Sequence, residues 1–132
     1  MVITLDPRSP EPIFEQIAFA VKEAVARGEL SEGAQLPSVR ELAQELSINP
    51  NTVVRAYELL TREGVVVRRQ GAGCFITGRT SPMDGRHRRR ELSELFSRAV
   101  TEAFHLGFDA DDVRGAVEQA LSTVRFKERR QS

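Results

Sequence analysis

The stretch LPSVRELAQELSINPNTVVRAYELLTREG, residues 36–64, holds two short helical patterns separated by a few polar residues. In its first half the apolar residues fall at i, i+3, i+4 and i+7, and Ser38 is followed three residues later by Glu41, the spacing of a capping box. Asn49 suits the N-cap of the next helix, and Pro50 suits its first position, where the missing N–H costs nothing. The stretch therefore predicts two consecutive helices joined by a tight turn.

The flanking residues supply the other elements of the same domain. Residues 13–27 carry apolar residues at helical spacing, and residues 28–36 are expected to form a loop. VVVRRQGAGCFITG, residues 65–78, contains two β-prone runs around a Gly-Ala-Gly turn, the pattern of a hairpin. VITLD, residues 2–6, predicts a short strand that the following prolines end. The predicted order of elements is helix, loop, helix, tight turn, helix and hairpin. This is the order of a winged helix-turn-helix, which places its last helix in the major groove of DNA.

Polar residues at the start of the third helix exceed what capping requires. On a helical wheel, Asn51 and Arg55 lie opposite the apolar stripe, and Thr52 lies on its flank. Asn can pair with adenine, Arg can pair with guanine, and the N–H groups of a first helical turn favour a phosphate. For any single residue, a solvated surface position is the alternative interpretation. The whole set in this helix order favours a DNA-reading face.

The predicted hairpin has a similar distribution of charge and bulk. Arg68, Arg69 and Gln70 precede the turn, whereas Gly71 and Gly73 leave little bulk at its tip. Such a tip can enter a minor groove or lie along the phosphate backbone. An ordinary hairpin with solvated arginines is the alternative.

The C-terminal residues predict a linker and two amphipathic helices. Residues 79–90, RTSPMDGRHRRR, form the linker, whose basic cluster Arg86–Arg90 is either solvated or in contact with DNA backbone. Gly107 separates the helices, Asp109 can cap the second one, and residues 127–132 are expected to be a frayed tail. Two such stripes cannot close a core alone, so they are expected to pack against the same pair in a second chain; folding back onto the winged domain is the alternative. The predicted dimer-forming residues are Leu92, Leu95, Phe96, Ala99, Ala103, Leu106, Val113, Val117, Leu121 and Val124.

Composition and charge restrict the class of protein. The 132 residues are 40% hydrophobic and 29% charged, which fits one ordinary domain or a small domain with an appendage. There are 19 basic and 19 acidic residues, so phosphate binding would require basic groups gathered on one face. Because no apolar run has the length of a membrane span and no signal peptide is evident, we expect a cytoplasmic, nucleoid-associated protein without a membrane partner. Cys74 is the single cysteine and is expected to be a small buried filler.

Several motifs in register resemble a known family. The region of about residues 10–78 contains, in order, the motifs PSVRELA, NPNTV-x-RAY, EG and G-x-G. In this register the region closely resembles the DNA-binding domain of GntR-type bacterial transcription regulators. The resemblance implies a winged helix-turn-helix that binds operator DNA as a dimer. Val54 and Cys74 depart from the family pattern, in which a polar or small residue and a threonine are usual. The candidate DNA-contacting residues are Ser38, Arg40, Asn51, Thr52, Arg55, Arg68, Arg69, Gln70, Gly71 and Gly73.

The short C-terminal part resembles that of the YtrA-like subfamily, whose members often lie beside transport operons. The sequence thus predicts an α+β fold, with a winged helix-turn-helix of three helices and a β-hairpin wing in residues 1–79. Residues 80–132 would hold the linker and an all-α, two-helix dimerisation segment.

We predict a sequence-specific transcription regulator of repressor type, a homodimer on double-stranded, palindromic operator DNA that controls a transporter operon. The alternative is a winged-helix protein-interaction module, which would offer an apolar patch on its third helix. No nucleophile–base pair, phosphate-cradling loop or metal-ligand cluster is recognisable, so neither an enzyme nor a cofactor is predicted. Binding of an unidentified small-molecule effector between the dimer helices is a further alternative that the sequence leaves open.

Overall fold

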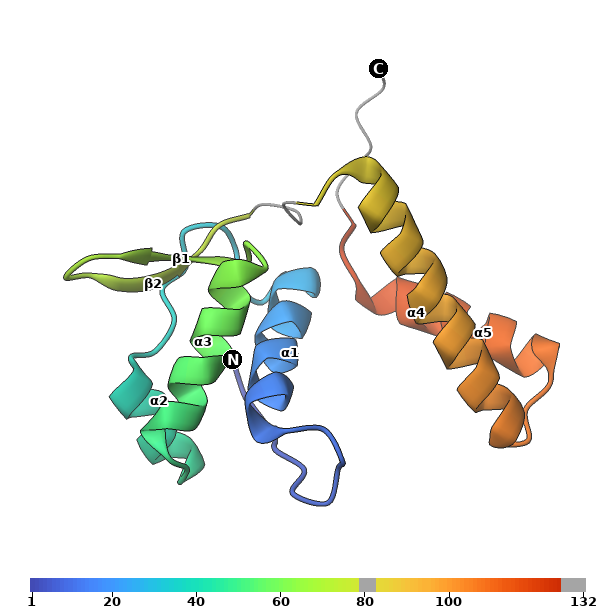
Figure 1. The fold of residues 1–132 in the computed structure, drawn as a ribbon, viewed down its shortest axis with the longest axis horizontal. Coiled ribbons are helices and arrows are strands. Elements are labelled where there is room, and N and C mark those ends of the chain that lie inside the picture. The colour runs from blue at the N-terminus through green and yellow to red at the C-terminus, as the bar shows by residue number, and fades with distance from the viewer. Residues whose placement is uncertain (79–82, 127–132) are drawn as a thin grey trace. The chain divides into compact units, whose positions relative to one another are not determined.

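The computed structural model describes residues 1–78 and 83–126, and the chain divides into two compact units, Met1–Ser81 and Pro82–Ser132. In the described residues the first unit contains three helices and an antiparallel two-stranded hairpin, and the second contains two helices (Figure 1). The predicted α+β fold, a winged helix-turn-helix followed by a helical part, is confirmed.

Helices α1 (Ile13–Ala26), α2 (Val39–Leu46) and α3 (Pro50–Arg62) form the helical part of the first unit. The predicted capping box begins α2, since the Ser38 hydroxyl accepts from the Glu41 N–H and the Glu41 carboxylate accepts from the Ser38 N–H. Ser47 then ends α2 in the left-handed conformation, with φ of 55°. This abrupt end leaves room for only a tight turn before α3.

The core of the first unit lies where the apolar faces of the three helices and the hairpin meet. Helices α1 and α2 both pack against α3, which also contacts the first strand of the hairpin. The largest fully buried side chains are Tyr57, Ile17, Leu42, Leu60, Val21 and Val53. Because α3 contributes three of these six, its orientation is fixed by the core of the whole unit.

The hairpin consists of β1 (Val66–Arg69) and β2 (Gly73–Ile76), with Val66 opposite Ile76. Cys74 lies on the buried side of β2, as predicted for a small filler. The segment before α2, expected to be a loop throughout, instead runs antiparallel along β2. Gln35 forms a β-bridge with Phe75, and the Leu36 N–H donates to the Cys74 carbonyl at 2.9 Å.

The prediction of a strand at residues 2–6 is wrong. No strand of the described residues pairs with this segment, so its backbone groups belong to no ladder. The side chain of Gln16 holds its end instead, because it accepts from the Asp6 N–H at 2.8 Å and donates to the Asp6 carbonyl at 2.9 Å. Ile3 and Leu5 pack against the core and account for the apolar pattern.

The second unit contains α4 (Gly85–His105) and α5 (Ala110–Thr123). The start of α4 corrects the predicted linker: the Asp84 carboxylate accepts from the His87 N–H at 2.9 Å, so Arg86–Arg90 belong to the helix. Asp109 caps α5, as predicted. The rest of the predicted linker includes residues 79–82, which lie outside the described residues, as does the predicted tail at 127–132.

Neither helix of the second unit has a buried residue. Leu95 is 64% exposed, Phe104 is 72% exposed and Leu106 is 73% exposed. Of the ten predicted dimer-forming residues, four are half-buried and the others are exposed; the half-buried ones are Ala103, Val113, Val117 and Val124. The apolar faces of α4 and α5 are therefore far from complete within the second unit itself.

Candidate nucleic-acid interface

Helix α3 has an apolar face on one side and a polar face on the other. Its apolar face, which includes Val53 and Leu60, is fully buried against the core. Asn51 and Arg55 are exposed on the outside, and Thr52 is half-buried at the flank, where the helical wheel placed them. The core thus fixes the outward face of α3 without using these polar side chains.

Capping accounts for one of the polar residues before α3. The Asn49 side-chain oxygen accepts from the Asn51 backbone N–H at 2.9 Å, and Pro50 occupies the first helical position. In the described part of the chain, the Asn51 side chain forms no hydrogen bond and remains available to a partner. Asn49 is therefore used to cap α3, whereas the Asn51 side chain is not needed to cap the helix.

Arg55 is held from a neighbouring helix by a contact that the sequence did not predict. Its guanidinium carbon lies 4.1 Å from the centre of the Phe14 ring on α1. Such a cation–π contact orients an arginine while leaving its N–H groups free to donate. Helical spacing within residues 13–27 does not reveal this contact, because it describes one helix and not its neighbours.

Tyr57 ties α3 to the beginning of α2. Its hydroxyl donates to the Pro37 carbonyl at 2.8 Å. Burial is the main cause that raises the pKa of Tyr57 well above its usual range, so the hydroxyl keeps its proton. This bond spans the helix-turn-helix and fixes the start of α2 relative to α3.

The predicted contact residues of α2 differ in their surroundings. Arg40 is exposed. Ser38 is exposed too, but its oxygen already accepts from the Glu41 N–H at 3.1 Å. The structure therefore gives Ser38 a capping role, with only the O–H left to donate to a phosphate.

The hairpin presents its polar residues outward and its glycines at the tip. Arg68, Arg69 and Gln70 are exposed, and the Arg69 guanidinium carbon lies 4.8 Å from the centre of the Phe75 ring. Gly71, with φ of 76°, has no atom within 4 Å of a built Cβ, so its side of the tip is open to a partner. Gly73, with φ of 112°, is different, because a Cβ there would lie 3.0 Å from the Gln35 side-chain nitrogen.

A surface hollow of about 540 Å³ brings the start of α2 and the hairpin together. Six of the ten predicted contact residues line it: Ser38, Arg68, Arg69, Gln70, Gly71 and Gly73. The other four, Arg40, Asn51, Thr52 and Arg55, lie outside its lining, on α2 and α3. The structure therefore places the candidate residues in two groups, one on the helices and one around the hairpin.

Residues 1–78 and 83–126 contain neither a candidate metal site nor a candidate membrane span. No three His, Cys, Asp or Glu side chains there are placed to hold a metal ion together. Within the same ranges, no helix combines the length and apolar character needed to cross a membrane.

The fold and the polar face of α3 define the class of a winged helix-turn-helix DNA-binding protein. Residues 13–76 match the model of the gntR family of bacterial regulatory proteins. The chain is 33% identical over 126 residues, which is 94% of its length and 95% of the relative, to the HTH-type transcriptional repressor YtrA of Bacillus subtilis. The chain belongs to the GntR family and is a DNA-binding transcription regulator.

Solved structures extend the similarity to the C-terminal part. A protein described as a transcriptional antiterminator from Listeria monocytogenes superposes with a TM-score of 0.82 at 27% identity, over 99% of this chain and 98% of that one. YtrA from Sulfolobus acidocaldarius, a GntR-family transcription factor, superposes with a TM-score of 0.63 at 36% identity, over 76% of this chain and 99% of its own. The predicted membership of a YtrA-like group is confirmed.

Proposed function

We propose that the protein is a homodimeric repressor that binds a palindromic operator through α3 and the hairpin wing. The observation that carries the proposal is the outward face of α3, where Asn51 and Arg55 are exposed above a buried apolar face. These side chains match the edges of adenine and guanine in the major groove. The arginines at the base of the wing suit the phosphate backbone or a minor groove. Such a regulator would act in the cytoplasm, where the DNA lies.

Repression is proposed from the relative named a transcriptional repressor, which aligns with nearly the full chain. A repressor of this type works by occupying its operator. Control of a transporter operon remains a proposal that rests on resemblance to the YtrA-like subfamily alone.

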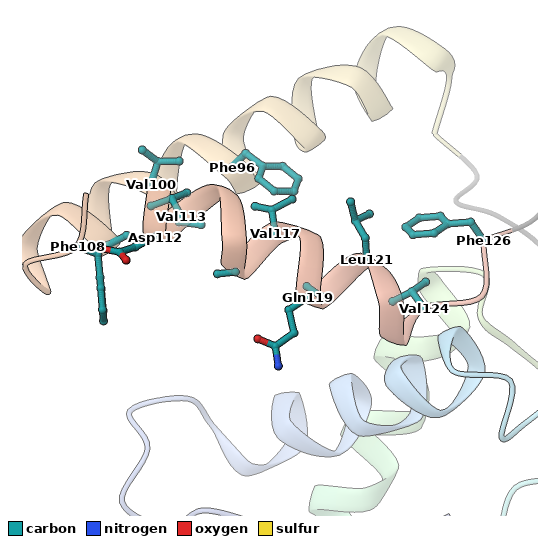
Figure 2. A pocket seen from close by; sticks show the side chains of 14 residues that line it. Phe96, Val100, Phe108, Asp112, Val113, Val117, Gln119, Leu121, Val124 and Phe126 are labelled. Carbon is teal, nitrogen blue, oxygen red and sulfur yellow. The ribbon is translucent and has the colours of Figure 1, made fainter. Parts of the chain in front are cut away.

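The dimer is proposed from the incomplete apolar faces of the second unit. A hollow of about 620 Å³ runs along α4 and α5, lined mainly by apolar side chains. Figure 2 shows Phe96 of α4 facing Val117 of α5, with Leu121, Val124 and Phe126 farther along the same side. A second copy of the two helices would cover this surface with side chains of the same kind.

Dimerisation also gives the DNA-binding unit its symmetry. A dimer with a two-fold axis matches an inverted repeat whose half-sites lie about one helical turn, 34–36 Å, apart. Linking two weak half-site contacts raises the overall affinity without any new contact to DNA.

A protein-interaction module is less well supported by the exposed surface. Among the described residues of the first unit, the large hydrophobic side chains that are exposed are Met1, Val2 and Phe19, and none belongs to α3. The outward face of α3 therefore lacks the apolar patch that such a module needs.

Selection from random double-stranded DNA by the full chain tests the proposed function. We expect enrichment of an inverted repeat, and mobility-shift titration of that site should show affinity falling as salt rises, because phosphate contacts release counterions. Recovery of no enriched sequence would contradict sequence-specific binding.

Two arginine variants test the assignment of contacts on the selected site. Arg40→Ala and Arg55→Ala should each weaken binding, and the loss for Arg55→Ala should be about 1–3 kcal/mol, the range for a direct base contact. Arg27→Ala is the matched control, because Arg27 is an exposed arginine that follows α1, pairs with Glu23 of that helix at 3.1 Å and is not among the predicted contact residues. Equal affinity of all three variants and the wild type would refute the assignment.

A further inference from the structure

The tip of the wing is held by a side chain that is not part of the hairpin. The side-chain nitrogen of Gln35 donates to the carbonyl oxygen of Ala72 at 2.7 Å, across 37 residues of sequence. Gln35 precedes α2, and Ala72 belongs to the turn between β1 and β2. The bond therefore joins the turn to the body of the first unit.

The turn has little else to fix it. The ladder ends at the pair Arg69 and Gly73, and within the turn the Ala72 N–H donates to the Arg69 carbonyl at 3.0 Å. All three residues of the turn, Gln70, Gly71 and Ala72, are exposed. Because an isolated two-stranded hairpin is only marginally stable in water, its tip needs an outside anchor to keep one position.

Gln35 is placed to provide that anchor. Its own backbone is fixed beside β2 by the bridge to Phe75 and by the adjoining bond from the Leu36 N–H to the Cys74 carbonyl. Its amide also lies against Gly73, where a built Cβ would approach the side-chain nitrogen to 3.0 Å. The glycine at this position leaves room for the Gln35 side chain.

From this geometry we infer that Gln35 is a positioning residue for DNA binding, which holds the wing tip in the conformation that meets the duplex. The inference rests on the proposed function and adds a residue to it. Gln35 acts through the tip backbone, and Gly71 and Gly73 have different roles: Gly71 leaves the tip open to DNA, and Gly73 accommodates the anchor.

The variant Gln35→Met tests the inference, because methionine has a similar length, carries no charge and has no N–H to donate. On the selected DNA site we expect about three- to tenfold weaker binding, the equivalent of one neutral hydrogen bond. Hydroxyl-radical footprinting should show loss of protection where the wing lies, with the protection beneath α3 retained. Unchanged affinity with a complete footprint would overturn the inference.

A second measurement separates positioning from a general loss of stability and needs no DNA. In NMR relaxation of the free protein, the Gly71 and Ala72 amides should be ordered in the wild type and mobile in Gln35→Met, with order parameters falling below about 0.6. The α3 amides and the melting temperature should stay nearly unchanged. Equal order at the tip in both proteins would overturn the inference, whereas failure of the wild type to select any DNA would instead refute the proposed function.

Discussion

The two units of the chain use the same kind of amphipathic helix but complete its apolar face in different ways. In the first unit, side chains such as Val53 and Leu60 are fully buried within a single chain. In the second, α4 and α5 also carry apolar stripes, yet neither helix has a buried residue. Helical periodicity therefore predicts which face is apolar, but the number and arrangement of neighbouring elements decide whether one chain can bury it.

The largest expected effect comes from charging the open apolar face. Leu95→Glu combined with Phe96→Glu should abolish dimerisation and weaken operator binding by about 100-fold or more, because the second half-site contact is no longer linked to the first. Mobility-shift titration measures the loss. Ser97→Glu with Thr101→Glu, on the opposite side of α4, is the matched control. Tight binding by the Leu95 and Phe96 variant would show that the face serves another purpose.

Truncating one large side chain in each unit should show whether its apolar face is completed within the chain or by association. Leu60→Ala removes a fully buried side chain and should lower the free energy of unfolding by about 2–5 kcal/mol at any protein concentration. Leu121→Ala should destabilise the protein by an amount that changes with concentration, since its face is completed only by association. Urea unfolding over a range of concentrations measures both, and a concentration-independent loss in Leu121→Ala would argue that one chain completes the second unit.

The N-cap side chains of the two capping boxes should respond differently to acid. The hydrogen bond from the backbone N–H of Asp112 is the main cause that lowers the pKa of Asp109. This cap therefore stabilises the folded state above the usual aspartate pKa of about 3.9, and the stabilisation is lost as pH falls through the lowered folded value. Ser38 does not titrate. Asp109→Asn should keep the cap and flatten the acid-dependent loss of helix content, as measured by circular dichroism from neutral pH into acid. The same steep loss in the variant would assign the acid response to other groups.

The smallest effect is expected at the surface of the first unit. Lys22 of α1 forms an ion pair with Glu63 at the end of α3, and both side chains are more than a third exposed to solvent. Glu63→Gln should cost less than about 1 kcal/mol, and high salt should remove most of that difference because exposed pairs are screened. A larger, salt-insensitive loss in urea unfolding would show that the pair does more than join two surfaces.

Local chemistry in the sequence was sufficient for much of the first unit. The capping residues Ser38 and Asn49, the proline that begins α3 and the glycines of the hairpin each have a short-range physical reason, and all are found where they were predicted. The apolar stripe of α3 also placed Asn51 and Arg55 correctly on the exposed side. Whether they contact DNA is a separate question that the proposed variants address.

Contacts between distant segments were not predictable in the same way. The Gln35 bond to Ala72, the Tyr57 bond to Pro37 and the contact of Arg55 with Phe14 each join two elements, and no periodicity within one element encodes them. The absent strand at residues 2–6 has a related cause, because alternation gives strand propensity but does not supply a partner strand. The basic residues Arg86–Arg90 were predicted to lie in a linker, whereas the cap at Asp84 starts α4 before them and places them in its first turns.

Sedimentation equilibrium of the full chain tests the central claim most directly. The chain has a mass of 14.8 kDa, and the account predicts a species of twice that mass, which the Leu95→Glu and Phe96→Glu variant converts to the single-chain mass while the Ser97→Glu and Thr101→Glu control does not. A wild-type protein that sediments as a single chain at every concentration tested would contradict the account.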